Sequence, residues 1–214
     1  MTDSDHMPLY VFAKAPIAGQ VKTRLQTHCS SQQAASIAEI LLSETLKRCT
    51  EFWPGELVLS VGNDSDHPFI QAIAAQYNIK VVGQCAGDLG NKMQNTFELY
   101  GTPAAIIGAD VALITQNSLG QAHTALSQHN NAIGPSEDGG YYLIGLAETH
   151  ASLFDGVDWG TADVMAQTMA RANDHAINLQ GLEMIRDIDE WVDVVYAAKK
   201  IPELAFYLRQ QRLD

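Results

Sequence analysis

Basic residues, cysteines and long apolar runs are all scarce in this chain of 214 residues. Lys and Arg number 13 against 25 Asp and Glu, a formal net charge of −12. This balance argues against general binding of duplex nucleic acid, which depends on a basic surface. The three cysteines, Cys29, Cys49 and Cys85, are widely spaced and odd in number, which predicts reduced thiols and a cytoplasmic protein. No run approaches the roughly 20 apolar residues of a membrane helix, so we expect no membrane span.

Several sequence motifs that mark common enzyme classes are also missing. The chain has no G-x-S-x-G, no H-E-x-x-H, and no G-x-G-x-x-G after its first apolar run. Its seven histidines are dispersed without the spacing of metal ligands. Where a phosphatase would carry an aspartyl nucleophile after its first strand, this chain has Ala13-Lys14. Serine hydrolases, zinc hydrolases, dinucleotide oxidoreductases and aspartyl phosphatases are therefore not expected.

The composition and the hydrophobic pattern predict one α/β domain. Hydrophobic residues make up 46% of the chain, and charged residues 18%, as in ordinary globular proteins. Short runs of Val, Ile and Leu alternate with segments of helical period, which is typical of a mostly parallel sheet with helices on both faces. A break in this alternation after Asp110 indicates a mixed sheet. The expected strands are 9–13, 57–61, 79–82, 104–108, 132–134 and 141–146, and the expected helices are 31–52, 68–77, 91–100, 117–128, 162–172, 190–199 and 202–211.

No repeat, linker or change in composition divides the chain. We therefore expect residues 8–214 to form the domain, with residues 1–7 as a polar, flexible tail that lacks the features of a signal peptide. In open α/β sheets, ligands bind beyond the carboxyl ends of the strands. Segments that follow strands are thus the places to look for chemistry.

The segment after the first strand is suited to bind a phosphate. No acidic residue occurs between Asp5 and Glu39, and this window contains Lys14, Lys22 and Arg24. A loop with Gly19 offers backbone N–H groups, and the cations add charge-assisted bonds. The segment lacks the glycine spacing of a P-loop. The alternative is a solvated basic loop that merely turns.

Three further segments carry candidate functional residues. In Gly87-Asp-Leu-Gly-Asn-Lys-Met93, Asp88 can cap the next helix and Lys92 can meet a diphosphate, although capping alone explains most of the segment. Asp110 follows a buried strand, and Asp187-Ile-Asp189 precedes a helix. Carboxylates placed in this way suit Mg²⁺, which is usually held by one or two of them together with substrate phosphates. Helix or turn capping is the alternative for each aspartate.

A fourth segment, Asp138-Gly139-Gly140, exposes backbone at a turn before an apolar strand. Two glycines allow a ligand to approach closely. A hairpin turn without any ligand predicts the same residues equally well.

Taken together, these segments resemble a known family in their order and spacing. The matching motifs run from residue 9 to about residue 195: Lys14-x-Pro-x-x-Gly-x-Val-Lys-Thr-Arg-Leu, Gly87-Asp-Leu-Gly, Gly108-x-Asp110 with Leu113-x-Thr115, Gly134-Pro-x-x-Asp-Gly-Gly-Tyr-Tyr-Leu-Ile-Gly-Leu146, Trp159-x-Thr161 and Asp187-Ile-Asp189. The resemblance is to a bacterial glycosyltransferase-like family, which includes proteins of arsenosugar biosynthesis and lies in the nucleotide-diphospho-sugar transferase superfamily.

The resemblance implies a single-domain glycosyltransferase-A fold, with a Rossmann-like nucleotide half and an acceptor half. It implies a Mg²⁺ or Mn²⁺ ion held by Asp110, which Asp187, Asp189 or Asp138 would join, and Lys22, Asp110 and Asp138 as catalytic residues. The acceptor, a small molecule, would meet Asp138, Gly139, Gly140 and Tyr141. The nucleotide and its phosphates would meet Ala13, Lys14, Gly19, Lys22, Thr23, Arg24, Gly87, Asp88 and Lys92.

Two positions depart from the family pattern. Val111-Ala112 stands where the family usually has Cys-Pro, and Asn91-Lys92 where it usually has Glu-Arg. Lysine replaces the planar bidentate clamp of arginine only as a point charge.

Three hypotheses follow from these patterns. The leading one is metal-dependent glycosyl transfer from a nucleotide-diphospho-sugar. The second is nucleotidyl transfer from a nucleoside triphosphate with release of pyrophosphate, because Lys22-Thr-Arg-Leu25 also resembles 2-phospho-L-lactate guanylyltransferases. The third is a degenerate member of the family that binds nucleotides without turnover, motivated by the two departures.

Overall fold

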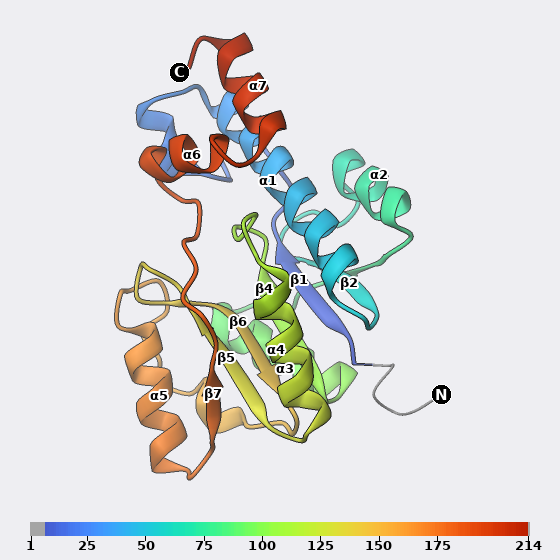
Figure 1. The fold of residues 1–214 in the computed structure, drawn as a ribbon, viewed down its shortest axis with the longest axis vertical. Coiled ribbons are helices and arrows are strands. Elements are labelled where there is room, and N and C mark those ends of the chain that lie inside the picture. Colours follow the sequence, from blue (N-terminus) through green and yellow to red (C-terminus); the bar gives the residue numbers. More distant parts are fainter. Residues whose placement is uncertain (1–6, 214) are drawn as a thin grey trace.

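Strands of three to six residues, most of them apolar, form a seven-stranded sheet in the computed structural model, which describes residues 7–213 (Figure 1). The strands are β1 (Leu9–Ala13), β2 (Leu57–Val61), β3 (Lys80–Gly83), β4 (Ala104–Gly108), β5 (Asn131–Pro135), β6 (Tyr141–Leu146) and β7 (Leu179–Gly181). The helices are α1 (Ser31–Phe52), α2 (Pro68–Tyr77), α3 (Leu89–Tyr100), α4 (Gln116–Ser127), α5 (Val164–Asp174), α6 (Trp191–Ala198) and α7 (Pro202–Gln211). Short 3₁₀ helices cover Thr23–Thr27 and Ala151–Leu153.

The strand order is β3-β2-β1-β4-β6-β5-β7. Strands β3, β2, β1 and β4 are mutually parallel, and β6 is antiparallel to both β4 and β5. β7 pairs in parallel with β5. The carboxyl ends of β1, β4 and β5 therefore share one edge of a mixed sheet, as the sequence predicted.

Helices cover both faces of the sheet because alternate strand residues point to opposite sides. On one face, Leu9 and Val11 pack with α1, α2 and α4 in the largest apolar cluster. On the other face, Tyr10 packs with Met93 and Phe97 of α3. In Figure 1, α1 and α4 lie in front of the strands.

A third apolar cluster lies beyond the sheet edge. The first half of α1 packs there against α6 and α7, with Ile37, Leu41, Val194 and Leu204 fully buried. Figure 1 shows these three helices together at one end of the molecule. The chain reaches them through residues 182–190, a segment that runs from β7 to α6 and is called the strap below.

Most expected elements form, and several have the expected bounds. β1, β2, β4, β6, α1, α2 and α7 begin and end where the pattern predicted. The predicted helix 91–100 instead begins at Leu89, because Asp88 caps it. The helix predicted from residue 162 begins at Val164, and the short strand β7 was not expected. Within residues 7–213, no helix has the length and apolarity needed to cross a bilayer.

Met7 belongs to the core, although the sequence analysis assigned it to the tail. Met7 is 2% exposed, and its carbonyl oxygen accepts a hydrogen bond from Trp53 Nε1 at 2.9 Å. The ordered domain therefore includes Met7, while residues 1–6 of the expected tail lie outside the described residues.

A buried hydroxyl ties helix α1 to the end of β4. Thr45 is 0% exposed, and its Oγ1 donates to the carbonyl of Ala109 at 2.9 Å. Ala109 immediately precedes Asp110, so this bond holds the backbone next to a candidate site residue.

We predict that Thr45→Val lowers the free energy of unfolding by about 1–3 kcal/mol, because the carbonyl of Ala109 loses its donor in a buried place. Thr50→Val on the same helix is the matched control, since the Thr50 hydroxyl lies at an exposed position and bonds only to Leu46 O of its own helix. Its effect should stay within about 0.5 kcal/mol. Urea unfolding followed by circular dichroism measures both. Equal losses in the two variants would contradict the role assigned to Thr45.

Candidate functional site

A cleft of about 600 Å³ opens at the carboxyl edge of the sheet. Its walls come from the loop after β1, the segment between β3 and α3, the end of β4 and the end of the strap. Residues predicted for the site that line it are Ala13, Lys14, Lys22, Thr23, Arg24, Gly87, Asp88, Lys92, Asp110 and Asp189. The parallel strands thus bring most of the predicted nucleotide and metal residues together.

The centre of this cleft is the ammonium of Lys22. Its Nζ lies 2.6 Å from Asp110 Oδ1, 2.7 Å from Asp189 Oδ1 and 2.5 Å from the carbonyl oxygen of Ile188. An ammonium has three N–H donors, so these three oxygens account for all of them. The side chain of Lys22 is only 6% exposed. Lys22, predicted as a phosphate ligand, is therefore held by protein oxygens in this structure.

The charges of this trio reinforce one another. Burial alone would lower the pKa of Lys22, but the carboxylates of Asp110 and Asp189 outweigh it, and the pKa is raised. Burial likewise acts to raise the pKa of Asp189, but Lys22 and then Arg24 outweigh it, and this pKa is lowered. Both partners of the Lys22–Asp189 pair are thus held in their charged forms.

The backbone of Lys22 adopts φ 46° and ψ 42°, the left-handed region that residues with a β-carbon seldom occupy. Lys22 directly precedes the 3₁₀ helix Thr23–Thr27. A left-handed residue that is not glycine persists where its surroundings over-determine it, often at functional sites. Here its side chain is fixed by the three oxygens.

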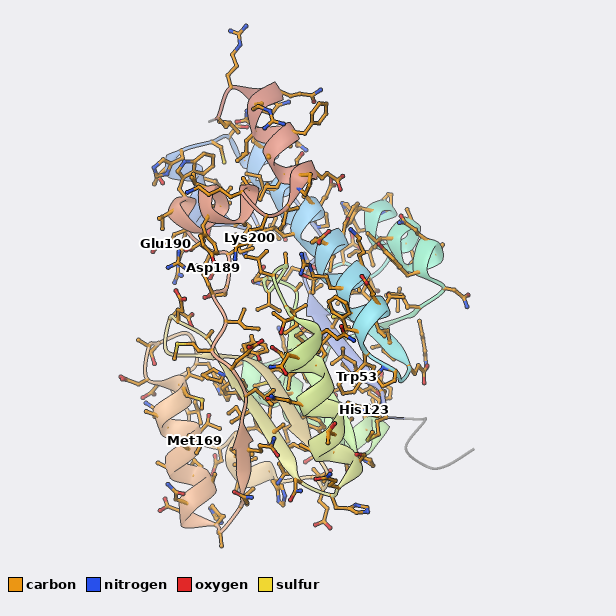
Figure 2. All side chains as sticks on the ribbon, in the orientation of Figure 1. Trp53, His123, Met169, Asp189, Glu190 and Lys200 are labelled. Atoms are coloured by element: carbon orange, nitrogen blue, oxygen red, sulfur yellow. The ribbon has the colours of Figure 1, made fainter. Side chains whose placement is uncertain are left out.

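The strap brings Asp189 to Asp110. Ile188 N donates to Asp110 O at 3.1 Å, so the strap is bonded to the chain just after β4. At the far end, Asp193 Oδ2 accepts from the backbone N–H of Glu190 at 2.8 Å and of Asp189 at 3.3 Å. Figure 2 shows Asp189 and Glu190 where the strap meets α6.

Asp187 lies on the same strap among like charges. Burial raises its pKa to about 6, and the nearby charges of Asp138, Asp189 and Asp110 add to the effect. The four predicted carboxylates are therefore close enough to interact. Only Asp110 and Asp189, however, converge on Lys22.

The oxygens around Lys22 also fit a divalent cation. Two carboxylates and a carbonyl form an all-oxygen set of the kind that Mg²⁺ and Mn²⁺ prefer, and the Asp110 side chain is 51% exposed to the cleft. Within residues 7–213, no group of three or more His, Cys, Asp or Glu side chains is arranged to hold a metal ion. A cation in this place would thus take at most two carboxylates from the chain and its other ligands from substrate or water.

The start of α3 forms the facing wall. Asp88 Oδ1 accepts from Asn91 N at 2.9 Å, and Asn91 Oδ1 accepts from Asp88 N at 3.2 Å, a reciprocal capping box. The capping interpretation of Asp88 is confirmed, and Oδ1 of its carboxylate is engaged by that bond. Lys92 follows on this first turn and lines the cleft.

The turn between β5 and β6 holds Asp138. Its Oδ1 accepts from Ser136 Oγ at 2.6 Å and from Gly140 N at 2.9 Å. Gly139 has φ +91°, and a β-carbon there would lie 2.0 Å from the carbonyl oxygen of Ala162. The two glycines predicted the close approach of another group, and the group that approaches Gly139 is the backbone of Ala162.

Tyr141 and Gly19 do not line the cleft. The Tyr141 hydroxyl lies 3.8 Å from Met93 Sδ, and its ring packs edge-on against Trp159. Burial raises its pKa well above the usual range. The sequence assigned Tyr141 to the acceptor, but the first position of β6 turns its ring to the α3 face of the sheet.

Two of the sequence motifs meet in this region. A β-carbon on Gly90 would lie 2.5 Å from Trp159 Nε1. Position 90 therefore has no room for a side chain, because the indole packs on the first turn of α3. This contact explains the second glycine of Gly87-Asp-Leu-Gly by packing, without a ligand.

Several residues that line the cleft were not predicted from the sequence, among them Phe12, Gln20, Leu42 and Gln84. Gln84 directly follows β3, and its Nε2 donates to Ser60 O at 2.9 Å. Its position directly after a parallel strand is the sequence feature that could have identified it as a cleft residue.

We predict that Gly139→Ala destabilises the fold by about 1–3 kcal/mol more than Gly101→Ala, because its new methyl group meets a backbone carbonyl. Gly101 is the matched control, with φ +88° and nothing within 4 Å of an added β-carbon. Thermal or urea unfolding of the two variants gives the difference. A loss for Gly139→Ala no larger than that for Gly101→Ala would contradict the packing of this turn.

Solved structures share this fold at low sequence identity. A protein from Desulfovibrio desulfuricans G20, described as a proposed nucleotide-diphospho-sugar transferase, matches with a TM-score of 0.84 and 24% identity, over 97% of this chain and 96% of its own. A nucleotidyl transferase from Methanothermobacter matches with a TM-score of 0.58 and 12% identity, over 92% of this chain and 98% of its own. The manganese complex of Rv0371c from Mycobacterium tuberculosis H37Rv matches with a TM-score of 0.56 and 13% identity, over 91% and 100%.

Among curated proteins, none matches the chain significantly. One family model matches residues 45–161, which is more than half of the chain. Its description reads "Uncharacterized protein conserved in bacteria (DUF2064)". The chain therefore belongs to the DUF2064 family.

Proposed function

We propose that this protein is a metal-dependent transferase that uses a nucleotide-activated donor, with a nucleotide-diphospho-sugar as donor and glycosyl transfer as the reaction. The observation that carries the proposal is the cleft itself, which is lined by Lys14, Lys22, Arg24 and Lys92 as well as by Asp110 and Asp189. Cations beside paired carboxylates suit a diphosphate bridged by a divalent ion. The shared fold of a proposed nucleotide-diphospho-sugar transferase supports this assignment.

In this proposal, the nucleotide and its phosphates lie along the loop after β1 and the first turn of α3. Lys14 and Arg24 face the phosphates as charged donors, and Lys92 meets them as a point charge at the amino end of a helix. Thr23 adds a hydroxyl to the same wall. These groups bind and orient the donor before any bond breaks.

The acidic side of the site holds the cation and receives the acceptor. Asp110 and Asp189 would hold Mg²⁺ or Mn²⁺, which supplies neutralisation of the charge that develops on the diphosphate leaving group. A small acceptor would enter beside Asp138 and Asp187. Since Asp138 Oδ1 is engaged by Ser136 and Gly140, any proton transfer by this residue falls to Oδ2.

Nucleotidyl transfer is the second candidate. The segment Lys22-Thr-Arg-Leu25, which resembles guanylyltransferases, contributes Lys22, Thr23 and Arg24 to the cleft, and a nucleotidyl transferase shares the fold. In that reaction a nucleoside triphosphate would be the donor and pyrophosphate the leaving group.

The test is thermal unfolding with nucleoside diphosphates, nucleoside triphosphates and nucleotide-sugars, each with and without Mg²⁺ or Mn²⁺. A donor at about 100 times its Kd should stabilise the fold by about 2.7 kcal/mol, or about 5–10 °C in Tm. Asp110→Asn should abolish the metal-dependent part of the shift. Asp174→Asn, an exposed position on α5, is the control and should keep it.

Product analysis with the stabilising donor then separates the two chemistries. Release of a nucleoside diphosphate supports glycosyl transfer, whereas release of pyrophosphate from a triphosphate overturns it. A shift without turnover would favour the degenerate nucleotide-binding member. No shift with any donor would contradict the whole proposal.

A further inference from the structure

Lys22 already occupies the position that a cation would take. Its ammonium is within 2.7 Å of one oxygen on Asp110 and one on Asp189, and the Ile188 carbonyl takes its third donor. Within residues 7–213, these two aspartates are the ion-pair partners of Lys22. The ammonium and a divalent ion bound by the same two oxygens cannot be present together.

The cost of exchanging the two cations depends on what arrives with the divalent ion. A free divalent ion would push the ammonium off both carboxylates and leave a nearly buried charge without a counter-ion, which is strongly unfavourable. A divalent ion that arrives on a diphosphate brings anionic oxygens into the same cleft. The ammonium then exchanges one set of oxygens for another.

We propose that Lys22 excludes a free divalent cation from Asp110 and Asp189, so that the cleft takes up the cation only with anionic phosphates that receive the ammonium. The identity of the anion as a nucleotide diphosphate rests on the proposed function, whereas the competition itself does not. Lys22 is thus a specificity-determining residue for the form in which the cation binds.

The cleft contains a natural comparison for this role. Lys14 lines the same cleft and follows β1 directly, but its ammonium makes no ion pair with an acidic side chain of residues 7–213. Lys14→Met and Lys22→Met therefore remove the same charge from the same cleft. Only the second removes the ammonium from Asp110 Oδ1 and Asp189 Oδ1, and Arg24 Nη1 remains 3.5 Å from Asp189 Oδ2 in both variants.

The experiment measures Mn²⁺ binding without any nucleotide, by electron paramagnetic resonance of the free ion. Lys22→Met should bind Mn²⁺ at least about tenfold more tightly than the wild type, because one unit charge is removed from the ligand oxygens. Lys22→Arg keeps the charge and should stay near the wild type. Lys14→Met should change the affinity by less than about threefold. Lys22→Gln, which keeps an uncharged donor, replaces Lys22→Met if that variant does not fold.

Equal Mn²⁺ affinity of the wild type and Lys22→Met, or an equal gain in Lys14→Met, would overturn the proposal. A second series adds ADP, CDP, GDP or UDP, with protein-free samples to correct for Mn²⁺ held by the nucleotide. A nucleotide that stabilises the wild type should raise its Mn²⁺ affinity toward that of Lys22→Met. If Lys22→Met gains affinity but no nucleotide acts on the wild type, the competition stands and the proposed donor fails.

Discussion

The ammonium of Lys22, shared by Asp110 and Asp189, joins three segments that are far apart in the chain. It connects the loop after β1, the end of β4 and the strap that leads to α6. Without the ammonium or another cation, the two carboxylates would face each other uncompensated in a partly enclosed cleft, which is unfavourable. Breaking a paired buried charge is much costlier than the pair is worth, so this contact helps to hold the three segments, together with the backbone bond from Ile188 N to Asp110 O.

The strand order is what makes the contact possible. β1 and β4 are parallel neighbours in the middle of the sheet, so their carboxyl ends, and the residues that follow, lie side by side. β7 is the edge strand next to β5. From there the strap passes Ser136, just after β5, and reaches Asp110, just after β4, before it enters α6. The backbone bond from Ile188 N to Asp110 O fixes its path. The site is therefore a consequence of topology. Lys22 and Asp110 are far apart in the sequence and meet because β1 and β4 end side by side.

The fold could be predicted from hydrophobic periods because most of the strands are buried on both faces and the helices are amphipathic. The short strand β7 could not, since Leu179-Gln-Gly181 has one buried residue and no alternation. In the site, position after a strand identified Lys14, Lys22 and Asp110. The contacts that these side chains make could not be predicted from their position after a strand. The ion pair of Lys22 with Asp189 depends on the path of the strap, and the packing of Trp159 on Gly90 depends on a contact between distant segments.

The two departures from the family pattern differ in their physical weight. Val111 and Ala112, in place of Cys-Pro, are buried in the core, and neither lines the cleft beside Asp110. Asn91, in place of Glu, still completes the capping box with Asp88, so the first turn of α3 keeps its geometry. Lys92 alone changes the chemistry of a cleft wall, from a planar fork to a point charge. Under the proposed function, a point charge would attract a diphosphate without orienting it, and orientation would fall to Lys14, Thr23 and Arg24 on the opposite loop. Under the proposed function, the departures therefore keep a cation at residue 92 and replace the planar fork of arginine there by a point charge.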